Sequence, residues 1–163
     1  MTGEQLTRWT ARVALLLYAA TLMLRHTRPP RANLARQLWT AGCFVFLLHV
    51  AAAFQFFHHW SHADAYRETA RQTAELVGTP TGWGLYLNYL FTGIWAIDSA
   101  AWWTRGTDAY RARPRWLRVG VDVFMAFMAF NATVVFGHGA TRWVSAFVTL
   151  LLFAQATNTR TRR

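Results

Sequence analysis

Histidines in the first half of this sequence have the spacing of metal ligands. His58 and His62 are four residues apart, so an unbroken helix would place both imidazoles on one face. His59 precedes His62 by three residues, and His138 lies in a later turn that we expect on the same side of the protein. Asp64 adds a carboxylate, and imidazole with carboxylate suits Zn, Cu, Fe or Ni. The sequence therefore predicts a transition-metal site at His58, His59, His62, His138 and Asp64.

Haem is the alternative cofactor for the same histidines. Its two axial ligands must face each other from different elements, an arrangement open to His58 or His59 together with His138. A capping serine at Ser61 would instead end the first helix before His62 and remove the shared face. Histidines at a membrane interface also occur without any ligand. Metal, haem and no ligand are therefore three alternatives for this segment.

A second set of polar residues lies inside long apolar segments, and it comprises His49, Asn88, Asp98, Asp122 and Asn131. Such side chains are costly in hydrocarbon, so each indicates either pairing or function. We expect His49 to face other helices, and the asparagines to form interhelical hydrogen bonds. Ion pairs are the plain interpretation of the aspartates, Asp98 with Arg105 and Asp122 with Arg118. A proton or cation site shared by both carboxylates is the alternative.

The elements that carry these residues are apolar blocks separated by arginines. The 163 residues are 54% hydrophobic and carry a net charge of +10. A basic chain ordinarily suggests nucleic-acid binding. Here the cations lie between the apolar blocks, as they do in the loops of membrane proteins, so we expect a lipid bilayer as partner and no nucleic acid. The single cysteine excludes a disulfide framework and a cysteine-rich metal site.

Five segments have the length and hydropathy of transmembrane helices, which need about 20 apolar residues. They cover residues 6–24, 38–60, 83–103, 116–136 and 142–157. Between the second and third, Ser61 predicts a helix cap and Gly78 a stop, so we expect an amphipathic surface helix over residues 62–77. The predicted fold class is all-α: one transmembrane domain over residues 1–163, a polytopic bundle of five transmembrane helices with a short surface helix.

The distribution of arginine predicts the orientation of this bundle. Residues 25–36 carry four arginines, residues 105–118 carry five, and the C-terminal tail carries three. The positive-inside rule places these regions in the cytoplasm. We therefore expect a bacterial cytoplasmic membrane protein with its N-terminus outside and its C-terminus in the cytoplasm. The histidine segment then faces outward.

Two functions from different classes follow. One is a small integral membrane protein with an outward-facing histidine site for a metal or haem. The other is a non-catalytic membrane subunit that assembles with itself or a partner protein, or that lines a path for a small solute. Motifs for nucleotide binding, a nucleophile elbow or a C-x-x-C pair are absent, so the sequence leans away from an enzyme.

Overall fold

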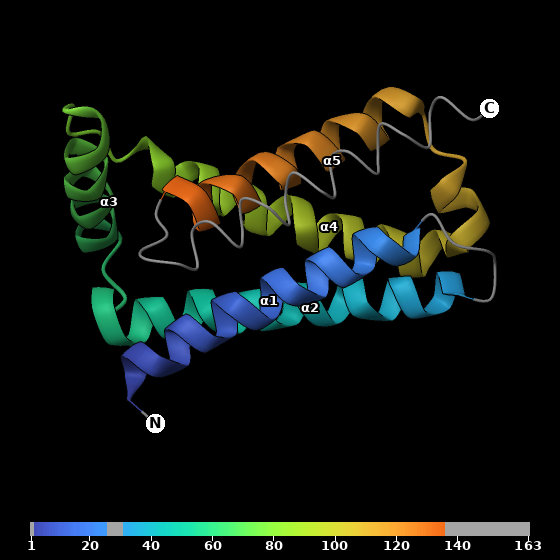
Figure 1. Cartoon of the computed structure of the whole chain (residues 1–163), viewed down its shortest axis with the longest axis horizontal. Coiled ribbons are helices and arrows are strands. Elements are labelled where there is room, and N and C mark those ends of the chain that lie inside the picture. The colour runs from blue at the N-terminus through green and yellow to red at the C-terminus, as the bar shows by residue number, and fades with distance from the viewer. Residues whose placement is uncertain (1, 26–30, 136–163) are drawn as a thin grey trace. The chain divides into compact units, whose positions relative to one another are not determined.

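The computed structural model describes residues 2–25 and 31–135, and every regular element in these ranges is a helix (Figure 1). The prediction of an all-α fold is confirmed for this part of the chain. The predicted span at 142–157 and His138 lie outside it. In chain order the elements are α1 (Gly3–Arg25), α2 (Ala32–Ala53), the π-helical segment η2 (Phe54–His58), α3 (His62–Val77), α4 (Trp83–Arg111), α5 (Arg115–Phe130) and the π-helical segment η3 (Asn131–Val135).

Contacts divide the chain into two compact units, Met1–Arg111 and Ala112–Arg163. In the first unit, α1 lies antiparallel beside α2, and α4 packs against α2 (Figure 1). The surface helix α3 contacts α4 and η2, and it runs across the end of α2. In the second unit, α5 continues directly into η3.

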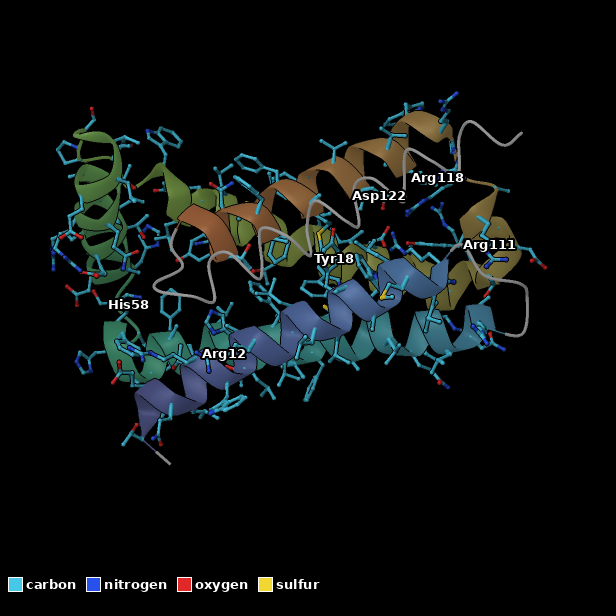
Figure 2. The ribbon with its side chains drawn as sticks, in the orientation of Figure 1. Arg12, Tyr18, His58, Arg111, Arg118 and Asp122 are labelled. Atoms are coloured by element: carbon cyan, nitrogen blue, oxygen red, sulfur yellow. The ribbon has the colours of Figure 1, made fainter. Side chains whose placement is uncertain are left out.

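Aromatic rings from three helices form the core of the first unit. The ring centroid of Trp39 on α2 lies 5.9 Å from that of Tyr18 on α1 and 5.3 Å from that of Trp95 on α4. The Trp95 indole N–H donates to the Trp39 carbonyl at 3.2 Å. Gly42 allows this approach, because a Cβ at that position would lie 2.9 Å from the Trp95 ring. Tyr18 is labelled in Figure 2. These contacts fix α1, α2 and α4 against one another.

The same three helices expose many large apolar side chains. Leu16, Phe44 and Ile97 are exposed to 69%, 62% and 72%, whereas Asp98 and Thr21 are buried. Large apolar side chains of soluble proteins are mostly buried, and aspartate is almost never fully buried unless it is paired. The first unit therefore has a mainly apolar core that also holds Asp98, and it exposes large apolar side chains on α1, α2 and α4.

Among the described residues, one helix is long and apolar enough to cross a membrane. It runs from Ala32 to His58, through α2 and η2, with a mean hydropathy of 1.8. Only 17% of its most apolar window is buried against the rest of the protein. Helix α1 has sufficient length but carries Arg8 and Arg12, and α5 has 16 residues before η3 begins. Membrane insertion thus has support from one helix, and the other four spans stay predictions.

The surface helix agrees with its predicted bounds, since α3 covers His62–Val77. The Ser61 hydroxyl oxygen accepts the Asp64 backbone N–H at 3.2 Å, as expected of an N-cap. Gly78 ends the helix with φ of 77°, a left-handed conformation that favours glycine. Both signals are local, which explains why the sequence alone locates this helix.

Candidate functional site

A buried polar cluster of the first unit surrounds the Asp98 carboxylate, and it is formed by Arg25, Trp39, Asp98, Trp102 and Tyr110. The Tyr110 hydroxyl donates to Asp98 Oδ2 at 2.5 Å, and Arg25 Nη2 lies 3.7 Å from the same oxygen. Arg25 Nη2 also donates to the Tyr110 hydroxyl at 3.1 Å. Asp98 is only 5% exposed, so these partners offset the cost of burying its charge.

A turn at Gly106 brings Tyr110 back to this carboxylate. Gly106 has φ of 74° and ψ of 167°, a conformation essentially restricted to glycine, and it breaks the direction of α4. The chain beyond it then places the Tyr110 ring on the Trp102 ring, with centroids 4.3 Å apart and planes 2° from parallel. The single glycine therefore sets the geometry of the cluster.

Two tryptophans hold the cation of the cluster. The Arg25 guanidinium carbon lies 4.2 Å from the centroid of Trp39 and 5.5 Å from that of Trp102. A desolvated cation–π contact contributes about 2 kcal/mol, and it adds to the ion pair with Asp98. The arrangement joins α1, α2 and α4 through one buried charge pair. Such a pair is suited to holding the helices in position.

Neither Arg25 nor Tyr110 was expected at Asp98 from the sequence, which suggested Arg105. Arg25 lies 85 residues from Tyr110 in the chain and belongs to a different helix. A local periodicity cannot detect a partner at this separation. Gly106 is the one signal in the sequence for the turn that precedes Tyr110.

The predicted outer histidines do not share one helix. His58 ends η2 beside α3 (Figure 2), and the next two residues are left-handed, His59 with φ of 48° and Trp60 with φ of 58°. A new helix then begins at His62. Of the two alternatives for this segment, the structure has the one in which Ser61 caps a new helix, so His58 and His62 do not share a helix face. Left-handed conformations at two successive residues with side chains cost about 1–2 kcal/mol each.

The histidines instead contact separate aromatic neighbours. The His58 ring lies 5.6 Å from the Phe54 ring, and His62 Nδ1 forms a hydrogen bond of 3.0 Å with the Tyr89 hydroxyl. Within residues 2–25 and 31–135, no three histidine, cysteine, aspartate or glutamate side chains come together as metal ligands do. The predicted set also includes His138, outside the described residues, so the metal or haem site stays a prediction.

A pocket of about 650 Å³ lies beside this segment, lined by Phe57, His58, Asp64, Arg67, Glu68, Arg71 and Gln72. Its charged groups pair with one another. Asp64 pairs with Arg67, and Arg71 lies 2.6 Å from Glu68 and also pairs with Glu75. The hydrogen bond from Arg71 lowers the pKa of Glu68, and the Ser61 hydroxyl followed by Arg67 lowers that of Asp64. Both carboxylates are therefore held in their ionised forms by neighbours of the same helix.

The remaining predicted polar residues have different surroundings. His49 Nδ1 lies 2.9 Å from the Thr7 carbonyl oxygen and so links α2 to α1. Asn131 donates to the Phe127 carbonyl of its own helix at 2.8 Å, whereas Asn88 is exposed on α4. Asp122 lies on α5, in the second unit. A site shared by Asp122 and the carboxylate of the first unit stays a prediction.

Comparison with protein-family models, curated proteins and solved structures gives no match for this chain. Function therefore has to be inferred from the residues themselves. Two kinds of observation bear on it: the distribution of polar and apolar side chains over the first unit, and the contacts of its individual charged and aromatic residues.

Proposed function

We propose that this chain is a polytopic protein of the bacterial cytoplasmic membrane that acts as a non-catalytic subunit of a membrane assembly. The large apolar side chains exposed on α1, α2 and α4, together with a buried ion pair, carry the proposal. The buried interior of the first unit contains the ion pair of Arg25 and Asp98, while Phe44 and Ile97 are exposed on its surface. Exposed apolar side chains are favourable in hydrocarbon, and a charge there has to be paired inside the bundle.

The apolar helix Ala32–His58 and the arginine distribution support five spans with the N-terminus outside. In this orientation α3 lies on the outer surface, and its charged residues meet water. The Asp98 cluster lies toward the cytoplasmic end of the bundle. Trp83 and Trp103, at opposite ends of the predicted third span, are exposed to 68% and 48%, as suits residues at the two headgroup levels.

The exposed amide of Asn88 supports the assembly role. It lies in the outer half of a predicted span, and its side chain makes no hydrogen bond to any of the described residues. An amide in hydrocarbon favours a partner on another helix, with energies of about 0.6–2 kcal/mol per hydrogen bond. A second membrane-embedded chain that packs on this face of α4 would supply one. We therefore place the assembly surface at Asn88.

Topology can be tested by labelling in intact cells. In a Cys43→Ala background, Gln72→Cys on α3 should react with an impermeant maleimide from outside. Thr107→Cys, after the Gly106 turn, should react only after the inner membrane is opened. The protein should also stay in the membrane during alkaline extraction. The reverse labelling pattern, or release into the alkaline supernatant, would contradict the proposed location.

Assembly can be tested by native mass spectrometry of the full chain in nanodiscs. The wild type should appear in a complex with a second copy or another membrane protein. Asn88→Leu should weaken this complex about fivefold, which corresponds to roughly 1 kcal/mol. Leu90→Val, a change at another exposed position of the same helix, is the matched control. A wild-type protein found only as a monomer would count against the assembly role without affecting the topology.

A further inference from the structure

Arg36, like Arg25, stacks on a tryptophan. It lies close in sequence to the Asp98 cluster but has a different environment. Its guanidinium carbon lies 3.9 Å from the centroid of the Trp103 ring, which is 48% exposed. The Trp103 indole N–H donates to the Thr40 hydroxyl at 2.8 Å. That hydroxyl in turn donates to the Arg36 carbonyl at 3.0 Å. The ring under the guanidinium is therefore fixed through the backbone of Arg36 itself.

The charge of Arg36 is not neutralised by the part of the chain that the structure describes. No carboxylate in residues 2–25 and 31–135 pairs with it. Its one side-chain contact to an oxygen is long, 3.5 Å from Nη2 to Asn33 Oδ1, and its buried Nε has no hydrogen-bond partner. Arg25, the other arginine stacked on tryptophan at this end of α4, has both a carboxylate and a hydroxyl.

We propose that Arg36, Thr40 and Trp103 form a binding site for the phosphate of an anionic phospholipid. A guanidinium stacked on a ring keeps its planar donors in a fixed fork, which matches two oxygens of one phosphate. The first turn of α2 contains no acidic residue and has no side-chain cap, so its partial positive charge favours the same anion. The half-exposed indole suits the level of the headgroups.

This inference rests on the proposed membrane location and adds a ligand to it. Arg36 comes just before the second predicted span, and Trp103 ends the third. Both residues then lie at the cytoplasmic surface, where anionic lipids attract arginine. A lipid phosphate bound there would bridge α2 and α4 at the boundary of the bilayer.

The test measures binding of phosphatidylglycerol to the full-length protein in detergent, by native mass spectrometry. Arg36→Gln is compared with Arg31→Gln, which removes the same charge from the same helix end without a stacked ring. Trp103→Leu is compared with Trp83→Leu, an exposed tryptophan of α4 at the opposite headgroup level. Unfolding curves for all variants establish that each is folded.

Each site variant should bind the lipid at least about fivefold more weakly than its control, because each control keeps the stacked guanidinium that holds the phosphate. The decisive variant is Trp103→Leu, because it changes no charge. Equal binding by the site variants and their controls would overturn the proposal. Displacement of the lipid by millimolar inorganic phosphate would overturn its assignment to a lipid. Topology is measured separately at Gln72→Cys and Thr107→Cys, so normal labelling with failed lipid binding counts against this site alone.

Discussion

Replacing Tyr110 with phenylalanine isolates the hydroxyl at the centre of the Asp98 cluster. The ring stack on Trp102 is kept, while Asp98 loses its 2.5 Å hydrogen bond and Arg25 loses its 3.1 Å bond. Hydrogen bonds to charged groups contribute about 1.5–3 kcal/mol each. The two hydrogen bonds share one hydroxyl, and Arg25 stays 3.7 Å from Asp98. We therefore expect the free energy of unfolding to fall by about 2–3 kcal/mol, which is less than the sum of two separate hydrogen bonds.

That loss corresponds to a decrease of about 30- to 150-fold in the ratio of folded to unfolded protein. It can be measured by reversible unfolding in mixed micelles with increasing dodecyl sulfate, followed through tryptophan fluorescence. Tyr86→Phe is the control, because the Tyr86 ring also contacts a tryptophan of α4, with centroids 5.4 Å apart and planes at 52°, but its hydroxyl forms no hydrogen bond to the described residues. The control should stay within about 0.5 kcal/mol of the wild type.

A double-mutant cycle with Asp98→Asn separates the hydrogen bond from other effects. Asp98→Asn alone leaves the Arg25 charge without its carboxylate and should cost about 3–5 kcal/mol. If the hydroxyl acts through Asp98, Tyr110→Phe should cost at least about 1 kcal/mol less when it is combined with Asp98→Asn than when it is made alone. Additive losses, or a Tyr110→Phe protein as stable as the Tyr86→Phe control, would refute the role assigned to this hydrogen bond.

Three further predictions concern other parts of the chain. Gly106→Ala should destabilise the protein by about 1–3 kcal/mol, because its backbone conformation favours glycine, whereas Gly120→Ala in α5 should not; equal stability would contradict this. The pKa of Asp64 is lower in the folded protein than in the unfolded chain. The ionised carboxylate therefore stabilises α3 fully above about pH 3.9, and this stabilisation is lost as the pH falls through the lower pKa of the folded protein. Hydrogen exchange should show that α3 opens faster at low pH, and that this change with pH is smaller in Ser61→Ala. Protection of α3 that does not change with pH would contradict this prediction. Protein from cells grown with zinc, copper and iron should carry metal that His138→Ala releases, and a metal-free wild type would end the metal hypothesis.

Elements with local signals could be predicted closely from the sequence. The surface helix begins after Ser61 and ends before Gly78, as expected, because a cap and a left-handed glycine act within a few residues. The second predicted span, 38–60, was less accurate, since the helix begins at Ala32 and ends at His58. Apolar length predicts the part of a helix that suits a bilayer, but backbone hydrogen bonding continues into polar sequence until a turn interrupts it.

The sequence by itself determined that the chain is helical, where its apolar blocks lie and which regions collect arginine, because these properties depend on composition and neighbouring residues. Tertiary structure alone decided which partner each polar residue meets. The turn at Gly106 returns Tyr110 to Asp98, and helix packing brings Arg25 to the same carboxylate and Arg36 to Trp103. These contacts join residues far apart in the chain, and their energies depend on burial and distance, which exist only once α1, α2 and α4 have packed together.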